Sequence, residues 1–251
     1  MKIECSNCFS EKCFIHNSCI GESVKLLEQS KNVIRFRKGQ YIFTEGSVVQ
    51  GIYVIQSGKV KVMNTGFNEK KQIIRFAKTG YLLGHRGLGG KYYQISAVAI
   101  EDSTLCFIEE NIFTLLLKND PEFTYQLMLF YAEELRIAET RMKNLAQMTV
   151  EEKTAEALLL IKKIFGVIKK NGDILLDVSL GRKDIAELAG LSSEQITRCF
   201  SEFKKEKIIE TQDKKIIILK TETLYNLISP YYPANIFKET LKTFQKISFL
   251  Q

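Results

Sequence analysis

Residues 182–204, RKDIAELAGLSSEQITRCFSEFK, have the pattern of two short helices joined by a tight turn. Gly190 suits the positive φ of a sharp turn, and Ser192 with Gln195 three residues later has the spacing of a capping box. Apolar residues then recur at helical spacing, at Ile196, Phe200 and Phe203. The stretch predicts a helix-turn-helix, which presents the leading end of its second helix to the major groove of DNA. An ordinary helical hairpin is the alternative.

The residues at the leading end of the second helix fall outside its apolar face. They are Ser193, Glu194, Thr197 and Arg198. An arginine there can donate two hydrogen bonds to guanine, and a glutamate can accept one from cytosine. Nearby basic residues complete the predicted DNA-binding set as candidates for phosphate contacts, namely Arg182, Lys183 and Lys204.

The composition is that of a globular protein, with 45% hydrophobic and 26% charged residues among 251. This length fits one large or two medium domains. The net charge of +7 suits an anionic partner, although no basic tail concentrates it. The chain has no run of about 18 apolar residues and no apolar signal segment, so we expect a cytoplasmic protein without a membrane partner. The six cysteines are then expected to be thiols or metal ligands rather than disulfides.

Between residues 32 and 111 short apolar runs alternate with glycine and other turn residues. The runs are VIRFRKG, YIFTEG, GIYVIQSG, KVKVMNTG, KQIIRFAKTG, YLLG, YQISAVAI and STLCFIE. Each has the length of a strand, and several alternate apolar and polar residues. About eight short strands at this spacing suggest a double-sheet β structure of the jelly-roll kind.

A long helix is expected from Pro121 to about Met148. Its apolar residues step by three and four, as in a heptad seam, at Met128, Tyr131, Leu135, Ala138, Met142 and Leu145. Such a seam predicts pairing with the same helix of a second copy. A helix that packs on its own β domain is the alternative.

Residues 150–170 form another predicted amphipathic helix. Beyond the helix-turn-helix, IIETQDKKIIILK has the pattern of a β-hairpin with a polar turn near residues 212–214, which completes a winged helix. The end of the chain is expected to be helical around residues 237–249, and we assign it no role. The predicted organisation is a Cys-bearing arm (1–20), a β-roll sensor domain (21–120), a dimerisation helix (121–148), a winged helix-turn-helix domain (149–221) and a C-terminal extension (222–251).

This order, with the strings FRKGQYIFTEGS, GIYVIQSGKVKV, GYLLG, EDSTLCFIE and the stretch quoted first, closely resembles the CRP/FNR family of bacterial transcription regulators, in its FNR-like branch. The resemblance covers about residues 5–220. It implies an α+β fold, with a cyclic-nucleotide-binding-like β-roll (a double-stranded jelly roll), a long dimerisation helix and a C-terminal winged helix-turn-helix. It also implies a homodimer that binds a palindromic site on double-stranded DNA, under the control of the β-roll, and that works with RNA polymerase.

The recognition helix of the FNR branch typically carries the pattern E-x-x-S-R. The matching residues here are Glu194, Thr197 and Arg198, and threonine keeps the hydroxyl of serine. Ser193 stands where the cyclic-AMP branch usually has arginine. The resemblance therefore implies FNR-like half-sites with a TGA core.

Members that bind cyclic AMP use a segment that resembles G-E-x-x-G, followed by R-S-A or R-T-A. Here Tyr81 stands in place of the glutamate ahead of Gly84, and Gln94 stands in place of the arginine. A partly buried phosphate without its fixed cation is poorly held. We therefore expect a degenerate effector pocket that does not bind cyclic AMP.

Oxygen-sensing FNR proteins hold a [4Fe–4S] cluster with three N-terminal cysteines and one cysteine on a later strand. The closest match here is Cys5, Cys8, Cys13 and Cys106, with Cys19 as a substitute and one residue fewer between Cys8 and Cys13 than in the family. Thiolates suit such a cluster. Tetrahedral zinc accepts the same thiolates, and plain thiols are the third alternative.

The function that follows is a homodimeric DNA-binding regulator whose β-roll senses a signal, with oxygen or redox state sensed through a cluster as one candidate. The alternative is a regulator of the same family without a cluster, which responds to an unidentified small ligand or a haem-bound gas. The chain has only two histidines, and His85 alone in the sensor loop gives little basis for haem. We find no nucleophile elbow, Walker motif or zinc-protease motif, so an enzyme is not expected.

Overall fold

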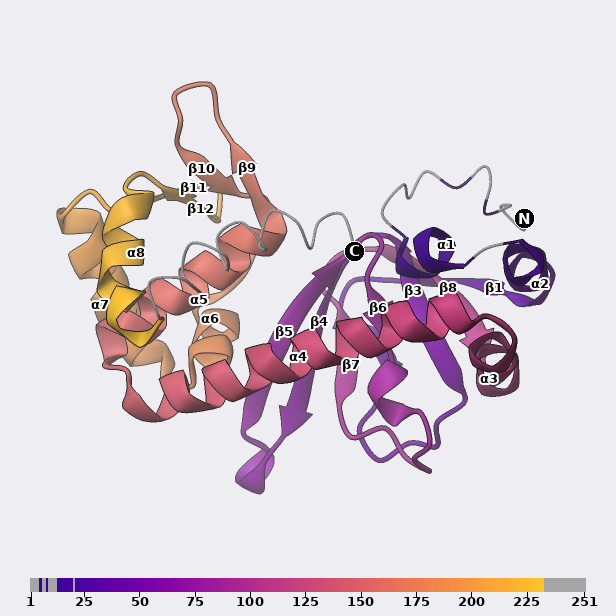
Figure 1. Cartoon of the computed structure of the whole chain (residues 1–251). Coiled ribbons are helices and arrows are strands. Elements are labelled where there is room, and N and C mark those ends of the chain that lie inside the picture. The colour runs from indigo at the N-terminus through magenta and orange to yellow at the C-terminus, as the bar shows by residue number, and fades with distance from the viewer. Residues whose placement is uncertain (1–4, 6–7, 9–12, 20, 233–251) are drawn as a thin grey trace. The chain divides into compact units, whose positions relative to one another are not determined.

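The computed structural model describes Cys5, Cys8 and residues 13–19 and 21–232. The chain divides into two compact units that meet at Arg136 and Ile137. The long helix α4 (Pro121–Gln147) runs through this boundary (Figure 1).

The first unit is built on two four-stranded antiparallel sheets. The first has the order β1 (Asn32–Phe36), β8 (Ser103–Glu109), β3 (Gly51–Ser57), β6 (Leu82–Leu83). The second has the order β2 (Tyr41–Phe43), β7 (Ser96–Ala99), β4 (Lys59–Thr65), β5 (Lys71–Lys78). Short 3-10 turns lie at η2 (Phe67–Glu69) and η3 (His85–Gly87). Each apolar run quoted above supplies one strand, which confirms the predicted β-roll.

The roll is filled mainly by aromatic and aliphatic side chains. The rings of Phe43 and Tyr93 stack at 4.3 Å between centroids, and the ring of Tyr53 lies 5.7 Å from that of Phe43. These residues belong to one buried cluster that includes Ile55 and Leu105 from the first sheet. The alternating residues of both sheets therefore meet in a single core.

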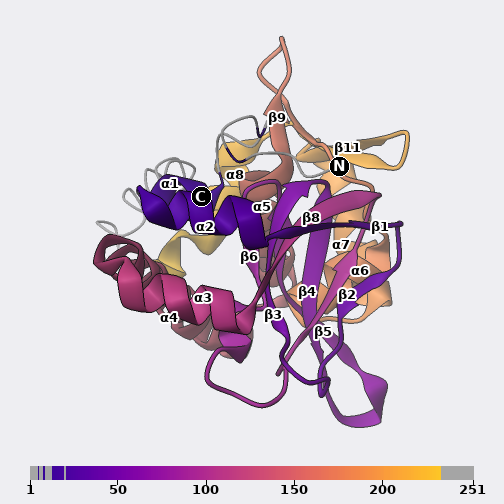
Figure 2. The same cartoon turned by 90° about the vertical axis from the view of Figure 1, so that its right-hand side faces the viewer.

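A second apolar cluster packs helices against the roll. Its members come from α1 (Phe14–Ser18), α2 (Glu22–Ser30), α3 (Glu110–Asn119), the start of α4, and the strands β3, β6 and β8. Figure 2 shows these helices on one side of the sheets. Helix α4 starts sharply because Pro121 is tolerated in a first turn and the buried Asp120 carboxylate accepts a hydrogen bond from the Phe123 backbone N–H at 3.0 Å.

The second unit contains the helix-turn-helix, formed by α6 (Arg182–Ala189) and α7 (Ser193–Lys205). Gly190 adopts φ +68°, as the turn requires. The Ser192 hydroxyl accepts from the Gln195 backbone N–H at 3.2 Å, and the Gln195 side chain accepts from the Ser192 N–H at 2.9 Å. The predicted turn and capping box are both confirmed.

The wing is larger than the sequence suggested. The predicted hairpin is present as β11 (Ile209–Gln212) and β12 (Lys215–Ile218), but a further hairpin, β9 (Gly166–Ile168) and β10 (Ile174–Leu176), extends the sheet in the order β11-β12-β10-β9. The helix predicted over residues 150–170 is therefore wrong beyond its first part, because α5 (Val150–Phe165) ends at Gly166. A Cβ at Gly166 would lie 2.4 Å from the Lys162 carbonyl oxygen, so the chain leaves the helix here on a glycine.

The described part of the C-terminal extension forms α8 (Thr221–Ile228) and the 3-10 turn η4 (Ser229–Tyr231). The helix expected around residues 237–249 lies outside the described residues. None of the described helices has the length and apolar character needed to cross a bilayer.

Candidate nucleic-acid interface and sensor site

The leading end of α7 presents polar side chains to solvent. Glu194, Thr197 and Arg198 are exposed, and Ser193 is half-buried beside them. Ile196 is fully buried on the opposite face and orients the helix. The Thr197 hydroxyl donates to the Ser193 carbonyl at 2.7 Å.

Glu194 and Arg198 lie one turn apart and influence each other. Hydrogen bonds from the Ser192 side chain and from the Glu194 backbone N–H lower the pKa of Glu194, and the charge of Arg198 lowers it further. Glu194 is therefore an ionised acceptor at neutral pH. A carboxylate and a guanidinium side by side can pair with the exposed edges of neighbouring bases.

The basic residues of the motif differ in their surroundings. The guanidinium of Arg182 lies 4.0 Å from the centre of the Phe200 ring, so a cation–π contact holds it against α7. Lys183 is exposed, with its ammonium 4.0 Å from Glu187. Lys204 is exposed at the end of α7, where it lines a depression against β11. Their contacts with phosphates stay predictions.

Exposed apolar side chains follow one face of α4. Five large ones are 42% to 70% exposed, namely Tyr125, Met128, Leu129, Leu135 and Met142. Of the predicted seam, Met128, Leu135, Ala138 and Met142 are exposed and Leu145 is half-buried. Tyr131 instead contacts the roll: its hydroxyl donates to the His85 carbonyl at 2.5 Å, and its ring packs against the buried cluster between the helices and the first sheet.

Three of the cysteines lie where helices meet the first sheet. Cys13 precedes α1 and Cys19 follows it, while Cys106 lies in β8. Cys19 and Cys106 are buried in the same apolar cluster, and Cys13 packs against that cluster. Segments far apart in sequence therefore bring their thiols to one region.

Cys5 and Cys8 approach the same region from the arm. The Cys8 backbone N–H donates to the Cys5 carbonyl at 3.2 Å. The ammonium of Lys31 donates to Cys5 Sγ at 2.9 Å, and the amide of Gln56 lies 3.9 Å from Cys8 Sγ. The sulfurs of the arm thus face hydrogen-bond donors of the roll.

Burial dominates the chemistry of the inner thiols. It raises the pKa of Cys13 to about 11 and that of Cys106 to about 11, and the charges of neighbouring cysteines add to both shifts. Cys19 has its pKa raised to about 12 for the same reason. All described cysteines are free, and within the described part of the chain no three His, Cys, Asp or Glu side chains stand close enough to hold a metal ion.

Comparisons with known proteins agree with this geometry. Residues 33–120 match the family model of the cyclic nucleotide-binding domain, and residues 152–227 match that of the Crp-like helix-turn-helix domain. Regulatory protein HlyX of Actinobacillus pleuropneumoniae is 28% identical over 226 residues, which cover 88% of this chain and 92% of that protein. The chain belongs to the CRP/FNR family.

Further relatives support the assignment of this CRP/FNR protein. The fumarate and nitrate reduction regulatory protein of Vibrio cholerae is 26% identical over 229 residues, 90% of each chain. The fold is shared with FixK2 from Bradyrhizobium japonicum, with a TM-score of 0.68, 24% identity and coverage of 78% of this chain and 96% of that one. The protein is thus a transcription regulator of CRP/FNR type with a DNA-binding helix-turn-helix.

At the predicted effector positions of this CRP/FNR protein, Tyr81, Gly84 and Gln94 supply no cation. Tyr81 is half-buried, and burial raises the pKa of its phenol to about 12. Gly84 has φ +80°, and a Cβ there would lie 3.2 Å from the Gly51 carbonyl oxygen. Gln94 is exposed, and its amide donates to the Tyr92 carbonyl at 3.3 Å.

Two arginines of the roll are instead turned toward Glu134 of α4. Arg86 donates to Glu134 Oε2 from Nε at 3.1 Å and from Nη2 at 2.9 Å. Arg75 Nε lies 3.6 Å from Glu134 Oε1, and its Nη2 donates to the Leu82 carbonyl at 2.9 Å. Burial alone would raise the pKa of Glu134, but Arg75, His85 and Arg86 together hold it far below its usual range.

His85 is a core residue of this group. It is 1% exposed, and its Nε2 lies 2.9 Å from Glu134 Oε2. Burial lowers the pKa of His85, against the opposing effect of Glu134. The Nδ1 atom of His85 is buried without a hydrogen-bond partner. In a neutral imidazole that donates from Nε2, this Nδ1 carries no proton, so no N–H donor is left unpaired. Its side chain is therefore occupied within the fold.

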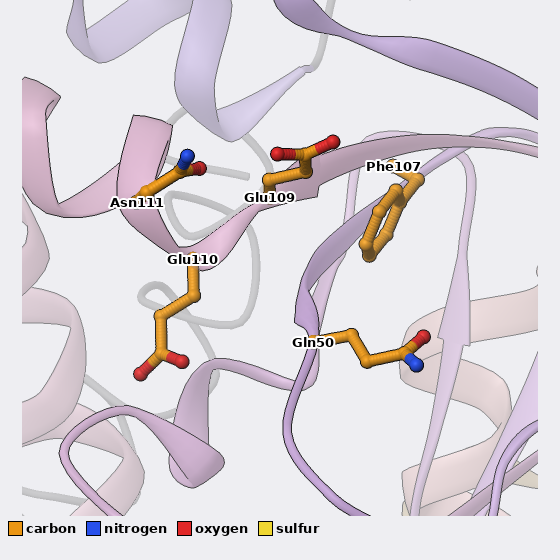
Figure 3. Close-up of a pocket in the computed structure, with 5 residues that line it drawn as sticks. All are labelled: Gln50, Phe107, Glu109, Glu110 and Asn111. Carbon is orange, nitrogen blue, oxygen red and sulfur yellow. The ribbon is translucent and has the colours of Figure 1, made fainter.

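A shallow pocket opens where β8 passes into α3. Its lining is Gln50, Phe107, Glu109, Glu110 and Asn111. Figure 3 shows that these side chains point in different directions and do not converge on one point. With two carboxylates and no cation in its lining, this pocket is unsuited to a phosphate.

The second unit contains a buried polar network that the sequence did not reveal. Asn144, at the end of α4, is fully buried and donates to Glu156 of α5 and, at 3.0 Å, to the Tyr232 hydroxyl. Tyr232 donates to Glu156 at 2.7 Å. Arg141 donates to the Leu188 carbonyl of α6 at 2.7 Å. These bonds join the end of α4 to α5, to α6 and to the described end of the extension.

Proposed function

We propose that this protein is a homodimeric, sequence-specific DNA-binding regulator that binds palindromic sites with FNR-like half-sites. The observation that carries the proposal is the exposed row Glu194, Thr197 and Arg198 on a capped helix. Arg198 reads guanine, Glu194 reads cytosine, and the Thr197 methyl and lone pairs face the base between them. Arg182, Lys183 and Lys204 contact phosphates and set affinity rather than sequence preference.

The proposed dimer forms along the exposed apolar stripe of α4. Large apolar side chains at heptad spacing are unfavourable in water and pair well with a second copy of the same helix. Met128, Leu135, Ala138 and Met142 are the central contacts. A two-fold dimer places its recognition helices in successive major grooves, which matches a palindromic site. RNA polymerase is the proposed partner of the dimer on DNA.

The proposed sensor is a [4Fe–4S] cluster held by Cys5, Cys8, Cys13 and Cys106, with Cys19 as a substitute ligand. The donor set fits in kind, because it consists of thiols from the arm and from β8, partly screened from water, with the Lys31 ammonium beside Cys5. When bound, such a cluster supplies a redox-active and oxygen-sensitive group.

The route from the cysteines to α4 is short. Cys13 is followed directly by Phe14, whose ring lies 5.1 Å from that of Phe130 and 6.3 Å from that of Phe123. Both partner rings belong to α4. A change in the position of Cys13 therefore moves Phe14 in a close-packed core and biases the helix that carries the proposed dimer contacts.

The experiment is an absorbance spectrum with iron and sulfide assays on the full chain purified without oxygen, followed by titration with a palindromic duplex. We expect iron and sulfide in cluster ratio, and duplex binding that weakens after exposure to air. A colourless, iron-free protein that still binds the duplex would support the proposed DNA-binding function and contradict the proposed cluster. The signal would then be an unidentified ligand of the roll. A protein that does not prefer a TGA-containing palindrome over a scrambled duplex of equal length would overturn the proposed sequence reading.

A further inference from the structure

Lys31 is an unusual residue of the first unit, because its side chain is 3% exposed. It follows α2 directly, and its backbone N–H donates to the Leu27 carbonyl at 2.9 Å, which fixes its position at the helix end. A buried ammonium is costly unless a negative charge pairs with it. The acceptor that faces its Nζ, at 2.9 Å, is Cys5 Sγ.

The fold places Lys31 beside the strand that carries the last proposed ligand. The residue after Lys31 begins β1, and in the pairing of β1 with β8 Val33 lies opposite Cys106. On its other edge β8 pairs with β3, where Val54 lies opposite Cys106. Lys31 thus reaches the cysteine region from the same sheet that presents Cys106.

The partner of the buried ammonium is a sulfur atom. A neutral thiol is a weak acceptor, and a buried ammonium is best paired with a negative charge. The contact between Lys31 Nζ and Cys5 Sγ, at 2.9 Å, therefore suits a cysteine that acts as a thiolate ligand.

We infer that Lys31 is a positioning residue of the cysteine site, which supplies the positive charge and the N–H donor that the thiolate ligands require. This inference rests on the proposed function, since it assigns Lys31 to the proposed [4Fe–4S] site. A cluster bound by thiolates carries net negative charge, and its reduction potential rises with nearby positive charge and with hydrogen bonds to sulfur. Gln56, whose amide lies 3.9 Å from Cys8 Sγ, is the neutral donor of the same site.

The test compares three variants of the full chain, purified and reconstituted without oxygen. Lys31→Met keeps the length of the buried side chain and removes its charge, while Lys31→Arg keeps the charge. Lys25→Met is the matched control, because Lys25 is an exposed lysine of α2. The readouts are iron and sulfide per chain, the midpoint potential of the one-electron couple, and the rate at which the visible absorption fades in air.

We expect Lys31→Met to lower the midpoint potential and to speed fading in air several-fold, because a cluster without the ammonium is oxidised more easily. Lys31→Arg should return both values toward the unmodified protein, and Lys25→Met should leave both unchanged. If the Lys31→Met variant binds the cluster with an unchanged midpoint potential and fading rate, the role of Lys31 is contradicted and the proposed cluster is not. If the unmodified protein takes up no iron and sulfide, this result contradicts both the proposed cluster and the role of Lys31 at it. A thermal melt separates either result from misfolding of the variant.

Discussion

Glu134 on α4 accepts a two-pronged hydrogen bond from Arg86 on the β-roll, at 3.1 and 2.9 Å. The carboxylate is mostly buried, with 13% of its side chain exposed. Arg86 approaches it from η3 and Arg75 from β5, so cations from separate parts of the roll meet one anion of the helix. The roll and α4 are therefore joined by the ion pairs of Arg86 and Arg75 with Glu134.

Removal of that anion should destabilise the first unit. Glu134→Ala leaves two arginines without their partner, and loss of one member of a buried pair costs about 3 kcal/mol. Urea unfolding of the full chain measures the change. The control is Glu133→Ala at the preceding position, which removes a more solvent-accessible pair with Arg136. Equal effects of the two substitutions would contradict a special role for Glu134.

His85 should make stability depend on pH. Burial keeps the folded imidazole neutral, with its pKa below the usual 6.5 despite the hydrogen bond to Glu134, and with Arg75 and Arg86 also opposing its protonation. The unfolded chain takes up a proton below about pH 6.5, so the contribution of His85 is complete above that pH and is lost as the pH falls. The loss approaches about 1.4 kcal/mol per pH unit.

His85→Gln keeps a donor for Glu134 and cannot titrate. We expect the free energy of unfolding of this variant to change less than that of the unmodified protein between about pH 6.5 and 5. Glu134 does not interfere in this window. Its folded pKa is depressed, so its own contribution is present above its ordinary pKa of 4.5 and is lost only below that pH. Parallel pH profiles for the two proteins would rule out a neutral buried His85.

The sequence predicted the elements whose signals are local. The strands of the roll follow from short apolar runs between glycines, and the helix-turn-helix follows from Gly190, Ser192 and Gln195, which lie within six residues of one another. The pairing of Glu134 with Arg86 joins residues 48 apart, and no local pattern indicates it. Steps of three and four marked Tyr131 as a seam residue, but α4 has a second apolar face toward the roll, and spacing alone does not assign a residue to one of them.

The wing illustrates a different limit. Residues 166–168, GVI, continue the apolar residues of α5, so a helix and a strand both fit this stretch. In the structure it pairs with β10, where Ile168 lies opposite Ile174, and β10 pairs in turn with β12, where Ile174 lies opposite Ile218. The strand that anchors this hairpin in the sheet is distant in sequence, so the prediction over residues 150–170 failed at its end.

Arg198→Ala should relax sequence preference at one G·C pair of each half-site. Loss of a bidentate contact with guanine reduces discrimination by about 1–3 kcal/mol. Lys204→Gln should instead weaken binding to all duplexes alike and reduce the slope of affinity against salt concentration, as expected for one phosphate contact. Selection from a randomised half-site, together with salt titrations, measures both. An unchanged base preference for Arg198→Ala would exclude direct reading by this residue.

Leu135→Glu should weaken the proposed dimer. Leu135 is 60% exposed on α4, so the substitution leaves the core of the chain intact. A symmetric dimer contains the position twice, and loss of two buried leucine contacts, at about 1.5–3 kcal/mol each, raises the dissociation constant by at least about 100-fold. Sedimentation equilibrium measures it, with Glu139→Gln on the exposed polar face of α4 as the control. A protein that is monomeric before any substitution would remove the proposed dimer altogether.

Tyr232→Phe should loosen the join between the end of α4 and α5. The Tyr232 hydroxyl donates to the buried Glu156 carboxylate at 2.7 Å and accepts from the buried Asn144 amide at 3.0 Å, so its removal takes one partner from each of these groups. Such a loss costs about 1–3 kcal/mol. Tyr231→Phe is the neighbouring control, because the Tyr231 hydroxyl donates to the more exposed Glu152 at 2.8 Å, where water can replace it. Urea unfolding should therefore separate the two phenylalanine variants. If they unfold alike, the network of Asn144, Glu156 and Tyr232 does not hold α5 to the end of α4.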